Sequence, residues 1–383
     1  MAGGGVAGIA AAITAARAGC RVALVERDNI IGGTAVSGQV GAICGLFRNG
    51  GSEPGELLNP GISAEIVAGL LAADPDRKFK KVGKVFILPY APSKLAQLLE
   101  SICLREQNLS LYPGATPGKA EVAGGRVTEV SVTSMGNALV FAPRVLIDCT
   151  GNGDLACLAG ARSEIAPVDK LQLAGYIARV GGICQVDDSL SLKVPFLVAK
   201  GIEKQELPGL LRFTVFTPGD SPGEGFLKIN LADSPENRHR TLDTEAGQLV
   251  SYLGRQLAEF RQAFIENTSE HIFPREGRRI VGSSLLTSED VLSARKFSDG
   301  VVKGAWPLEI WNPENGVSYR YPPDNDFYEI PAGCLRADGF TNLFVAGRCI
   351  SVTHEALGST RVIGCCIALG EQAAKAAASL AKS

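Results

Sequence analysis

The sequence predicts an α/β fold with a dinucleotide-binding βαβ unit near its N-terminal end and a second domain inserted later in the chain. Three observations favour this fold. A glycine-rich turn lies near the start of the sequence, and an apolar helical pattern and a β-type run follow it. After a stretch of different composition, a strand-and-turn pattern and a long apolar helix return towards the other end.

The glycine-rich turn reads G-x-G-x-x-G over residues 3–8. The apolar residues that follow recur at helical spacing, and Gly19 stands where a helix would end. A β-type run at 21–25 ends at Glu26, close to the ~20 residues at which a Rossmann-like unit places an acidic residue. The chain has 45 glycines, so an ordinary turn before a core helix is the alternative. The acidic residue favours the Rossmann-like unit.

Each residue type in this unit has a physical role. Gly3 allows a tight turn, Gly5 lets the backbone approach a pyrophosphate, and Gly8 lets the helix pack closely on the sheet. The helix start offers free N–H groups to phosphates. The carboxylate of Glu26 can accept hydrogen bonds from a ribose, and its charge favours a free 2′-OH over a 2′-phosphate.

A hydrophobic strand normally precedes such a turn and lies at the centre of the sheet, but only Met1 and Ala2 precede it here. We expect either that another segment fills this slot or that the chain is N-terminally clipped. In the second case we expect weak cofactor binding and reduced stability, which an upstream extension would restore.

Composition excludes several classes of protein. The 383 residues suggest two domains, and a hydrophobic fraction of 45% allows a sizeable core. A net charge of −2 gives no indication of nucleic acid or an anionic membrane as a partner, and neither a membrane-spanning run nor a signal peptide is visible. The ten cysteines show no C-x-x-C spacing and the three histidines are dispersed, so we expect no metal site. We expect a cytoplasmic protein with reduced thiols.

The remaining pattern divides the chain. We expect helices at 61–73, 93–106, 244–264 and about 360–380, strands at 85–88, 109–112 and 342–345, and a β-meander over 120–147 whose last strand runs to Asp148. A helix start is expected at Thr287. Prolines and charges are more frequent from 163 to 325. We interpret 163–325 as an inserted α+β domain, and 1–162 with 326–383 as the domain that surrounds it.

Five stretches together resemble the FAD-dependent oxidoreductases with a glutathione-reductase-type FAD fold, in particular the group related to the flavoprotein part of heterodisulfide reductase. They are residues 3–8 with Glu26, 32–34, 148–154, 275–282, and 342–348 continuing into 354–362. The resemblance implies a Rossmann-like FAD-binding domain with a β-meander and an inserted substrate or cap domain. It also implies FAD as the cofactor. Some relatives carry an iron–sulfur cluster, but their cysteine pattern is absent here.

The resemblance implies a set of FAD contacts. Residues 3–8 would hold the pyrophosphate, 32–34 would line the flavin side, and the helix after Arg361 would direct its N-terminus at the flavin pyrimidine ring. The implied cofactor-binding residues are Gly3, Gly5, Val6, Ala7, Gly8, Glu26, Arg27, Gly32, Gly33, Thr34, Thr150, Gly151, Asp154, Gly347, Arg348, Gly358, Arg361 and Val362. Two positions depart from the family pattern: Asn152 replaces a common Asp, and Gly277 replaces a common Ser.

Three residues are candidates for catalysis. His354 lies in the loop that the resemblance places near the flavin, where it could act as a general acid or base. Its alternative is a structural loop histidine. Arg278 and Arg279 could clamp a substrate carboxylate, or they could form ion pairs with Glu276 or Asp290.

The resemblance implies a hydride transfer between an organic small-molecule substrate and flavin N5, with electrons passed to an unknown second partner. The sequence leaves a homo-oligomer open. A flavin-binding protein or subunit without catalysis, from a truncated or decayed copy, is the alternative function. An NAD-binding dehydrogenase is a third interpretation, but it accounts for only about the first 26 residues.

Overall fold

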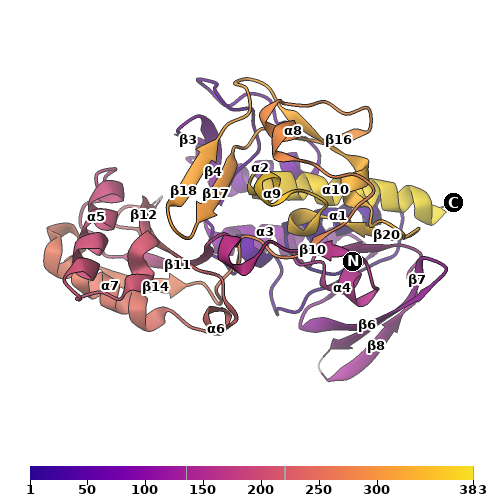
Figure 1. Cartoon of the computed structure of the whole chain (residues 1–383), viewed down its shortest axis with the longest axis horizontal. Coiled ribbons are helices and arrows are strands. Elements are labelled where there is room, and N and C mark those ends of the chain that lie inside the picture. Colours follow the sequence, from indigo (N-terminus) through magenta and orange to yellow (C-terminus); the bar gives the residue numbers. More distant parts are fainter. Residues whose placement is uncertain (135, 220, 383) are drawn as a thin grey trace.

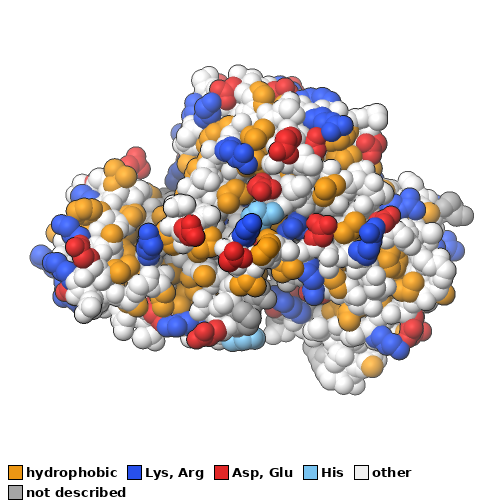
Figure 2. All heavy atoms as spheres, viewed as in Figure 1, with side chains coloured by type: hydrophobic (Ala, Val, Ile, Leu, Met, Phe, Trp, Pro, Cys, Tyr) orange, Lys and Arg blue, Asp and Glu red, His pale blue; other side chains and the backbone are white. Residues whose placement is uncertain are grey.

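The computed structural model describes residues 1–134, 136–219 and 221–382. Figure 1 shows a central α/β body, a β-meander at the lower right and a second lobe at the left. Lys and Arg side chains alternate with Asp and Glu side chains over the visible face, and neither sign gathers into a large patch (Figure 2). Among the described residues, no helix combines the length and apolar character that a membrane crossing requires.

The central sheet is parallel and is completed by the first residues of the chain. Strand β1 (Val22–Val25) pairs with β5 (Leu109–Tyr112), and β9 (Leu146–Asp148) pairs with β20 (Leu343–Val345). Ala2 lies between the two pairs, bridged to Val25 and to Asp148. Its N–H donates to Ile147 O at 3.0 Å, while the N–H of Gly3 donates to Val25 O at 2.8 Å. Residues 1–3 therefore occupy the central slot themselves at this end of the sheet.

Helix α1 (Val6–Arg17) follows the glycine-rich turn, as predicted, and its apolar residues from Ala7 onward are buried. Gly19 has φ +83° just after the helix, the left-handed conformation that favours glycine at a helix end. The C-terminal helix α10 (Ile363–Lys382) packs on α1. A Cβ at Gly370 would overlap Ala7 O, so glycine permits this close approach. The predicted helix at 360–380 is correct in place but begins at Ile363, because α9 (His354–Thr360) is a separate helix.

The β-meander has three strands, β6 (Ala115–Ala123), β7 (Arg126–Ser134) and β8 (Asn137–Phe141). The prediction was wrong about the last strand. β9 pairs in parallel with β20, so it belongs to the central sheet.

The second lobe is an antiparallel sheet in the order β12 (Val215–Pro218), β13 (Gly225–Leu231), β11 (Ala174–Gly181) and β14 (Phe264–Thr268), and it packs with helices α5 (Leu190–Glu203) and α7 (Asp243–Gln256). The helix predicted at 244–264 is too long. Leu257 is extended, with φ −125° and ψ 127°, and Phe264 begins the strand that pairs with β11.

Buried apolar residues form two clusters. The smaller one runs from Ala174 to Ile272 and lies within the second lobe, whereas Ile280, Val302 and Leu308 belong to the larger one. The domain limits at 163 and 325 stay a prediction. Most buried hydrophobic residues from Ile280 onward belong to the larger cluster, so they pack with the central body.

The other helices are α2 (Ile62–Ala73), α3 (Pro92–Arg105), α4 (Asp154–Leu158), α6 (Pro235–Arg238) and α8 (Ser288–Leu292). The other strands are β2 (Ala42–Ile43), β3 (Lys80–Val82), β4 (Val85–Pro89), β10 (Ser163–Glu164), β15 (Arg279–Ile280), β16 (Gly300–Gly304), β17 (Leu308–Asn312), β18 (Gly316–Arg320) and β19 (Tyr328–Pro331). The predicted helices at 61–73 and 93–106 and strands at 85–88 and 109–112 are confirmed to within about a residue at each end.

Candidate functional site

The start of α1 is tightly packed on one side and open on the other. A Cβ at Gly3 or Gly8 would overlap a backbone carbonyl oxygen, whereas a Cβ at Gly5 would meet no atom within 4 Å. Gly5 is the N-cap residue and supplies no side-chain hydrogen bond to the first turn. No side chain caps the first turn of α1, and the open space beside Gly5 leaves room for an anion at this helix start.

Glu26 is fixed beside this turn. Its residue is buried, and its Oε2 accepts a hydrogen bond from the N–H of Gly4 at 2.5 Å while Oε1 accepts one from the N–H of Asp28 at 2.9 Å. Arg27 points outward, with its Nε 3.6 Å from the carboxylate of Asp28. The structure therefore orients Glu26 at the glycine turn and leaves Arg27 largely exposed.

The second glycine-rich segment lies against the first. The N–H of Gly32 donates to Gly4 O at 2.7 Å, and a Cβ at Gly33 would lie 3.0 Å from Gly5 Cα. Thr34 is exposed at the start of the following turn. Two stretches that are separate in the sequence thus border one opening.

The Asp148–Asp154 segment forms a hydrogen-bonded turn beside Gly3. Asp148 Oδ1 accepts from the N–H of Thr150 at 2.9 Å and from its Oγ at 2.7 Å, and Oδ2 accepts from the N–H of Ala156 at 2.7 Å. Burial raises the pKa of Asp148 in spite of these hydrogen bonds. The N–H of Asp154 donates to Thr150 Oγ at 2.9 Å, which shapes the start of α4.

Gly347 and Arg348 follow β20. Gly347 has φ +83°, and a Cβ there would lie 3.2 Å from the Ala7 side chain. Arg348 donates to Gly151 O at 3.0 Å, to Asn152 Oδ1 at 2.9 Å and to Pro274 O. Its guanidinium joins two loops of the protein, and its role towards a phosphate stays a prediction.

The two departures from the family pattern meet each other. A Cβ at Gly277 would overlap Asn152 Oδ1, the atom that accepts a hydrogen bond from Arg348. A larger residue at 277 would therefore displace the amide of Asn152. The two departures fit each other in the structure, because glycine at 277 leaves room for the amide of Asn152. The sequence alone does not reveal this contact.

The start of α10 packs against a glycine-rich loop. The N–H of Gly364 donates to Cys44 O at 2.9 Å, and a Cβ at Gly45 would lie 2.5 Å from a methyl group of Val362. Just before α10, Arg361 Nη2 donates to Glu309 O at 3.2 Å. Arg361 Nε is buried without a hydrogen-bond partner in the described part of the chain. A Cβ at Gly358 would lie 2.7 Å from the same Glu309 O, so α9 and β17 are in close contact.

The three catalytic candidates do not converge on one point. Arg278 donates to Asn152 O at 3.1 Å and forms an ion pair with Asp154. Arg279 Nε donates to Val352 O at 3.0 Å, and its Nη1 is buried without a partner among the described residues. His354 Nδ1 lies 2.8 Å from Glu276 Oε2.

The ion-pair partners expected for the two arginines were wrong. Asp154 takes the place of Glu276 and Asp290 as the partner of Arg278, while Asp290 pairs with Arg295 at 2.8 Å. A pocket of about 520 Å³ brings Arg279 and His354 together with Glu355 and side chains of 163–170.

Arg361, a cofactor-binding candidate from the sequence, lies with three charged residues that the sequence analysis did not name as candidates. We call Lys228, Arg275, Glu309 and Arg361 the charged cluster. Glu309 accepts hydrogen bonds from the indole N–H groups of Trp311 at 2.6 Å and Trp306 at 3.0 Å. These are the two tryptophans of the chain, and their spacing around one carboxylate is the signal that could have identified it.

Arg275 is held by three contacts. It donates to Leu173 O at 2.5 Å and to Asn230 Oδ1 at 2.6 Å, and its guanidinium lies 4.1 Å from the centre of the Trp311 ring. Burial, aided by nearby Arg361, lowers the pKa of Arg275. Cys44 is electrostatically coupled to the cluster, and burial raises the pKa of its thiol to about 12, so it is a neutral thiol at pH 7.

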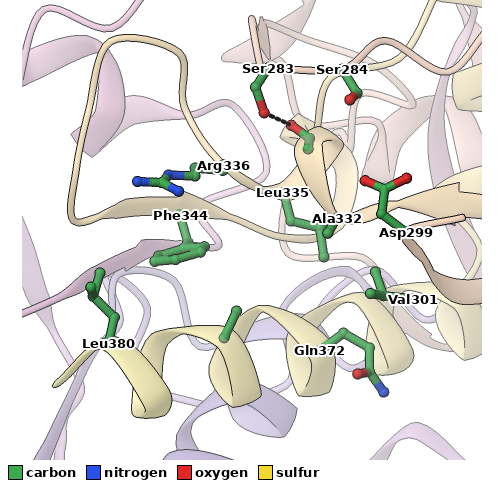
Figure 3. A pocket seen from close by; sticks show the side chains of 12 residues that line it. Ser283, Ser284, Asp299, Val301, Ala332, Leu335, Arg336, Phe344, Gln372 and Leu380 are labelled. Carbon is green, nitrogen blue, oxygen red and sulfur yellow. Dashed lines mark hydrogen bonds between the residues drawn. The ribbon is translucent and has the colours of Figure 1, made fainter. Parts of the chain in front are cut away.

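A second pocket, of about 390 Å³, lies over the outer face of α10 (Figure 3). Ser283 and Arg336 line it from one side, while Gln372 and Leu380 line it from the helix. Gln372 is about 14 Å along α10 from Ile363. This pocket therefore lies away from the helix start that borders the glycine-rich loop.

Comparisons with known proteins identify the family. The family model described as FAD dependent oxidoreductase matches residues 1–383. Flavin-dependent brominase Bmp2 is similar in structure, with 14% identity, 100% of this chain and 78% of that chain covered, and a TM-score of 0.51. A geranylgeranyl bacteriochlorophyll reductase-like protein from Thermoplasma acidophilum has 13% identity, coverage of 99% and 77%, and a TM-score of 0.46.

The aromatic hydroxylase CabE from angucycline biosynthesis has 15% identity and a TM-score of 0.45, with 74% of this chain covered. The chain spans only 53% of the length of CabE. No curated protein sequence is significantly similar to this chain. At 14% identity, the brominase structure shows the fold alone.

The match over the whole chain sets aside the NAD-binding dehydrogenase interpretation, which accounted for the first unit only. The geometry also fits FAD. Gly5 borders open space at the uncapped start of α1, and the buried carboxylate of Glu26 lies directly beside it. The chain therefore belongs to the FAD dependent oxidoreductase family.

Proposed function

We propose that the chain transfers a hydride between an organic small-molecule substrate and N5 of bound FAD, and passes the electrons to a second partner. Bound FAD would supply the redox chemistry, while the protein binds and orients the reactants and excludes water. The contacts implied for Gly3–Gly8, Glu26, 32–34 and Arg361–Val362 are part of this proposal.

One observation carries it: a face of the second lobe's sheet lies over the glycine-rich loop that packs on the start of α10. On β13, Leu227 and Ile229 belong to the core of the lobe, so Phe226 and Lys228 face the other way. A Cβ at Gly41 would lie 3.9 Å from the Phe226 ring.

A second contact joins the lobe to this loop. Ser269 Oγ, which follows β14, donates to Gly38 O at 3.2 Å. The sheet of the second lobe therefore covers the region where the glycine-rich loop meets α10. This covering sheet is an argument for a substrate chamber that is closed from bulk water.

His354 stays a candidate proton donor or acceptor. Its Nδ1 lies 2.8 Å from Glu276 Oε2, but the two atoms do not have hydrogen-bond geometry. His354 lines the pocket beside 163–170, whereas the charged cluster lies beneath the sheet. The second electron partner and a homo-oligomer are proposed without an assigned surface.

The test is anaerobic reduction of the FAD-loaded protein by a panel of metabolites, followed by flavin absorbance. We expect at least one organic substrate to bleach the yellow colour. Retained FAD that no metabolite reduces would favour a flavin-binding protein without catalysis. Acid precipitation should release the colour into the supernatant, since we propose non-covalent FAD.

A further inference from the structure

We propose that Lys228, Arg275 and Arg361 form a carboxylate-binding subsite, so that the substrate is an organic acid. This inference rests on the proposed function, since it assigns the substrate class of the same chamber.

Lys228 and Arg275 lie on the same face of the second lobe's sheet. Side chains at alternate positions of a strand share a face, so Lys228 and Asn230 on β13 point the same way. Arg275 reaches this face, because its Nη2 donates to Asn230 Oδ1 at 2.6 Å. A Cβ at Gly175, the partner of Asn230 on β11, would lie 3.7 Å from the same nitrogen.

Glu309 and Arg361 approach the same region from the body. Arg361 lies between α9 and α10 with its Nη2 4.0 Å from Glu309 Oε1, and the Trp311 ring that stacks on Arg275 also donates to Glu309. Burial lowers the pKa of Lys228, Arg275 lowers it further, and Cys44 and Glu309 oppose the shift. Lys228 lies near Arg275 because it shares a face of β13 with Asn230, which Arg275 contacts.

Two members have donors that the protein does not use. The Lys228 ammonium has neither a hydrogen bond nor an ion pair within the part of the chain that the structure describes. Arg361 Nε is likewise a buried donor without a partner there. Buried charges are normally paired, so these donors indicate a ligand.

The charge balance indicates an anion. Three cations face one carboxylate, and both oxygens of that carboxylate already accept indole hydrogen bonds. The thiol of Cys44 is neutral at pH 7 and offsets none of the positive charge. A planar guanidinium and an ammonium together match the two oxygens of a carboxylate. A carboxylate on the substrate would complete the pairing.

The test measures equilibrium binding to the oxidised holoenzyme and needs no turnover. Acetate, succinate and benzoate are titrated while flavin absorbance and calorimetric heat are recorded, with the matching amides as neutral controls and inorganic phosphate as a second anion. We expect at least one carboxylate to bind and its amide not to. Lys228→Gln should weaken that binding at least tenfold, while Lys228→Arg should retain most of it.

The matched control is Lys204→Gln, which removes the same charge from an exposed position of the second lobe. It should leave carboxylate affinity unchanged. Lys228 is chosen because Arg275 packs on Trp311, so a change at Arg275 could disturb folding.

Three results would overturn the proposal: no carboxylate binds, phosphate binds while carboxylates do not, or Lys228→Gln binds carboxylates as the wild type does. If Lys228→Gln shifts only the flavin midpoint potential, the cluster serves the cofactor alone. Carboxylate binding without flavin bleaching by any organic acid would leave the subsite intact and contradict the proposed hydride transfer.

Discussion

Gly5 and Gly8 belong to the same turn but have different surroundings. Gly5 borders open space, whereas a side chain at Gly8 would overlap Gly3 O. We predict that Gly5→Ala weakens FAD binding at least tenfold with little change in melting temperature, because its methyl group would enter the ligand space. Gly8→Ala should instead lower stability by about 1–3 kcal/mol through overpacking. FAD fluorescence titration and thermal melts of both variants separate the effects. Equal FAD affinity in Gly5→Ala would contradict a pyrophosphate at this turn.

Glu26 is the residue through which we expect the ribose to be bound. Glu26→Ala should weaken FAD binding by ~1.5–3 kcal/mol, the value typical of a charge-assisted hydrogen bond, or about ten- to a hundredfold in Kd. The protein should still fold, because Glu26 lies at the end of β1. Glu26→Gln is the matched variant, since it keeps the shape and removes the charge. FAD affinity that is unchanged in both would mean that the carboxylate only supports the turn.

Lys228 should set the pH dependence of anion binding. Its pKa is lowered by burial, so the ammonium loses its proton at a lower pH than an ordinary lysine does. We predict that affinity for a bound carboxylate falls as the pH rises through that lowered pKa. Cys44, Glu309 and Arg275 are the charged or titratable groups coupled to it. The profile should flatten in Lys228→Gln; a slope that persists would assign the titration to another group.

At the scale of elements, the short helix α8 depends on its start. Thr287 Oγ accepts from the N–H of Asp290, while the Asp290 carboxylate accepts from the N–H of Thr287 at 2.9 Å. We predict that Thr287→Ala lowers the free energy of unfolding by ~1 kcal/mol in urea at pH 7. Ser288→Ala is the control, because Ser288 is the first residue of the helix and makes no capping bond. Equal losses in both variants would contradict a specific role of the cap.

The same cap predicts a pH effect. Burial alone would raise the pKa of Asp290, but hydrogen bonds from Thr287 and Arg295 outweigh it and the pKa is lowered. A lowered folded-state pKa gives stability that is present above the unfolded-state value and is lost as the pH falls through the folded-state value. The stability difference between wild type and Asp290→Asn should therefore shrink on acidification below about pH 4.

Two errors at this scale show what periodicity cannot distinguish. Leu257, Phe260 and Phe264 continue the helical spacing of α7, yet Phe264 begins a strand because β11 offers it an open edge. The run before Asp148 follows the meander directly, but its partner is β20, nearly 200 residues later. Both outcomes depend on pairing with distant strands, which local pattern does not encode.

At the scale of the molecule, the two hydrophobic clusters predict two units of stability. Leu249 is fully buried in the smaller cluster, and Leu249→Ala should destabilise the second lobe by about 2–5 kcal/mol. We expect limited proteolysis to cut within 174–272 first, while FAD remains bound to the body. Leu24→Ala, in the larger cluster, is the comparison and should release FAD. Simultaneous loss of both units in Leu249→Ala would show that they unfold together.

The turn, helix and strand at the start of the chain could be predicted because their residues are consecutive. Residues 3–8 and Glu26 form one continuous unit, so their order alone specifies the turn, helix and strand. The charged cluster could not be predicted, because Lys228, Arg275, Glu309 and Arg361 come from four segments that only the packing of lobe and body brings together. Lys228 is a single charge in an apolar strand, which in isolation resembles an ordinary edge residue.

The close contact of α10 with α1 fixes the distance between the starts of the two helices. Gly370 lies about 10 Å along α10 from Ile363 and touches the first turn of α1 at Ala7. The contact therefore holds the starts of the two helices at a fixed separation. A side chain at position 370 would force the two helices apart, so we expect it to move one helix start relative to the other.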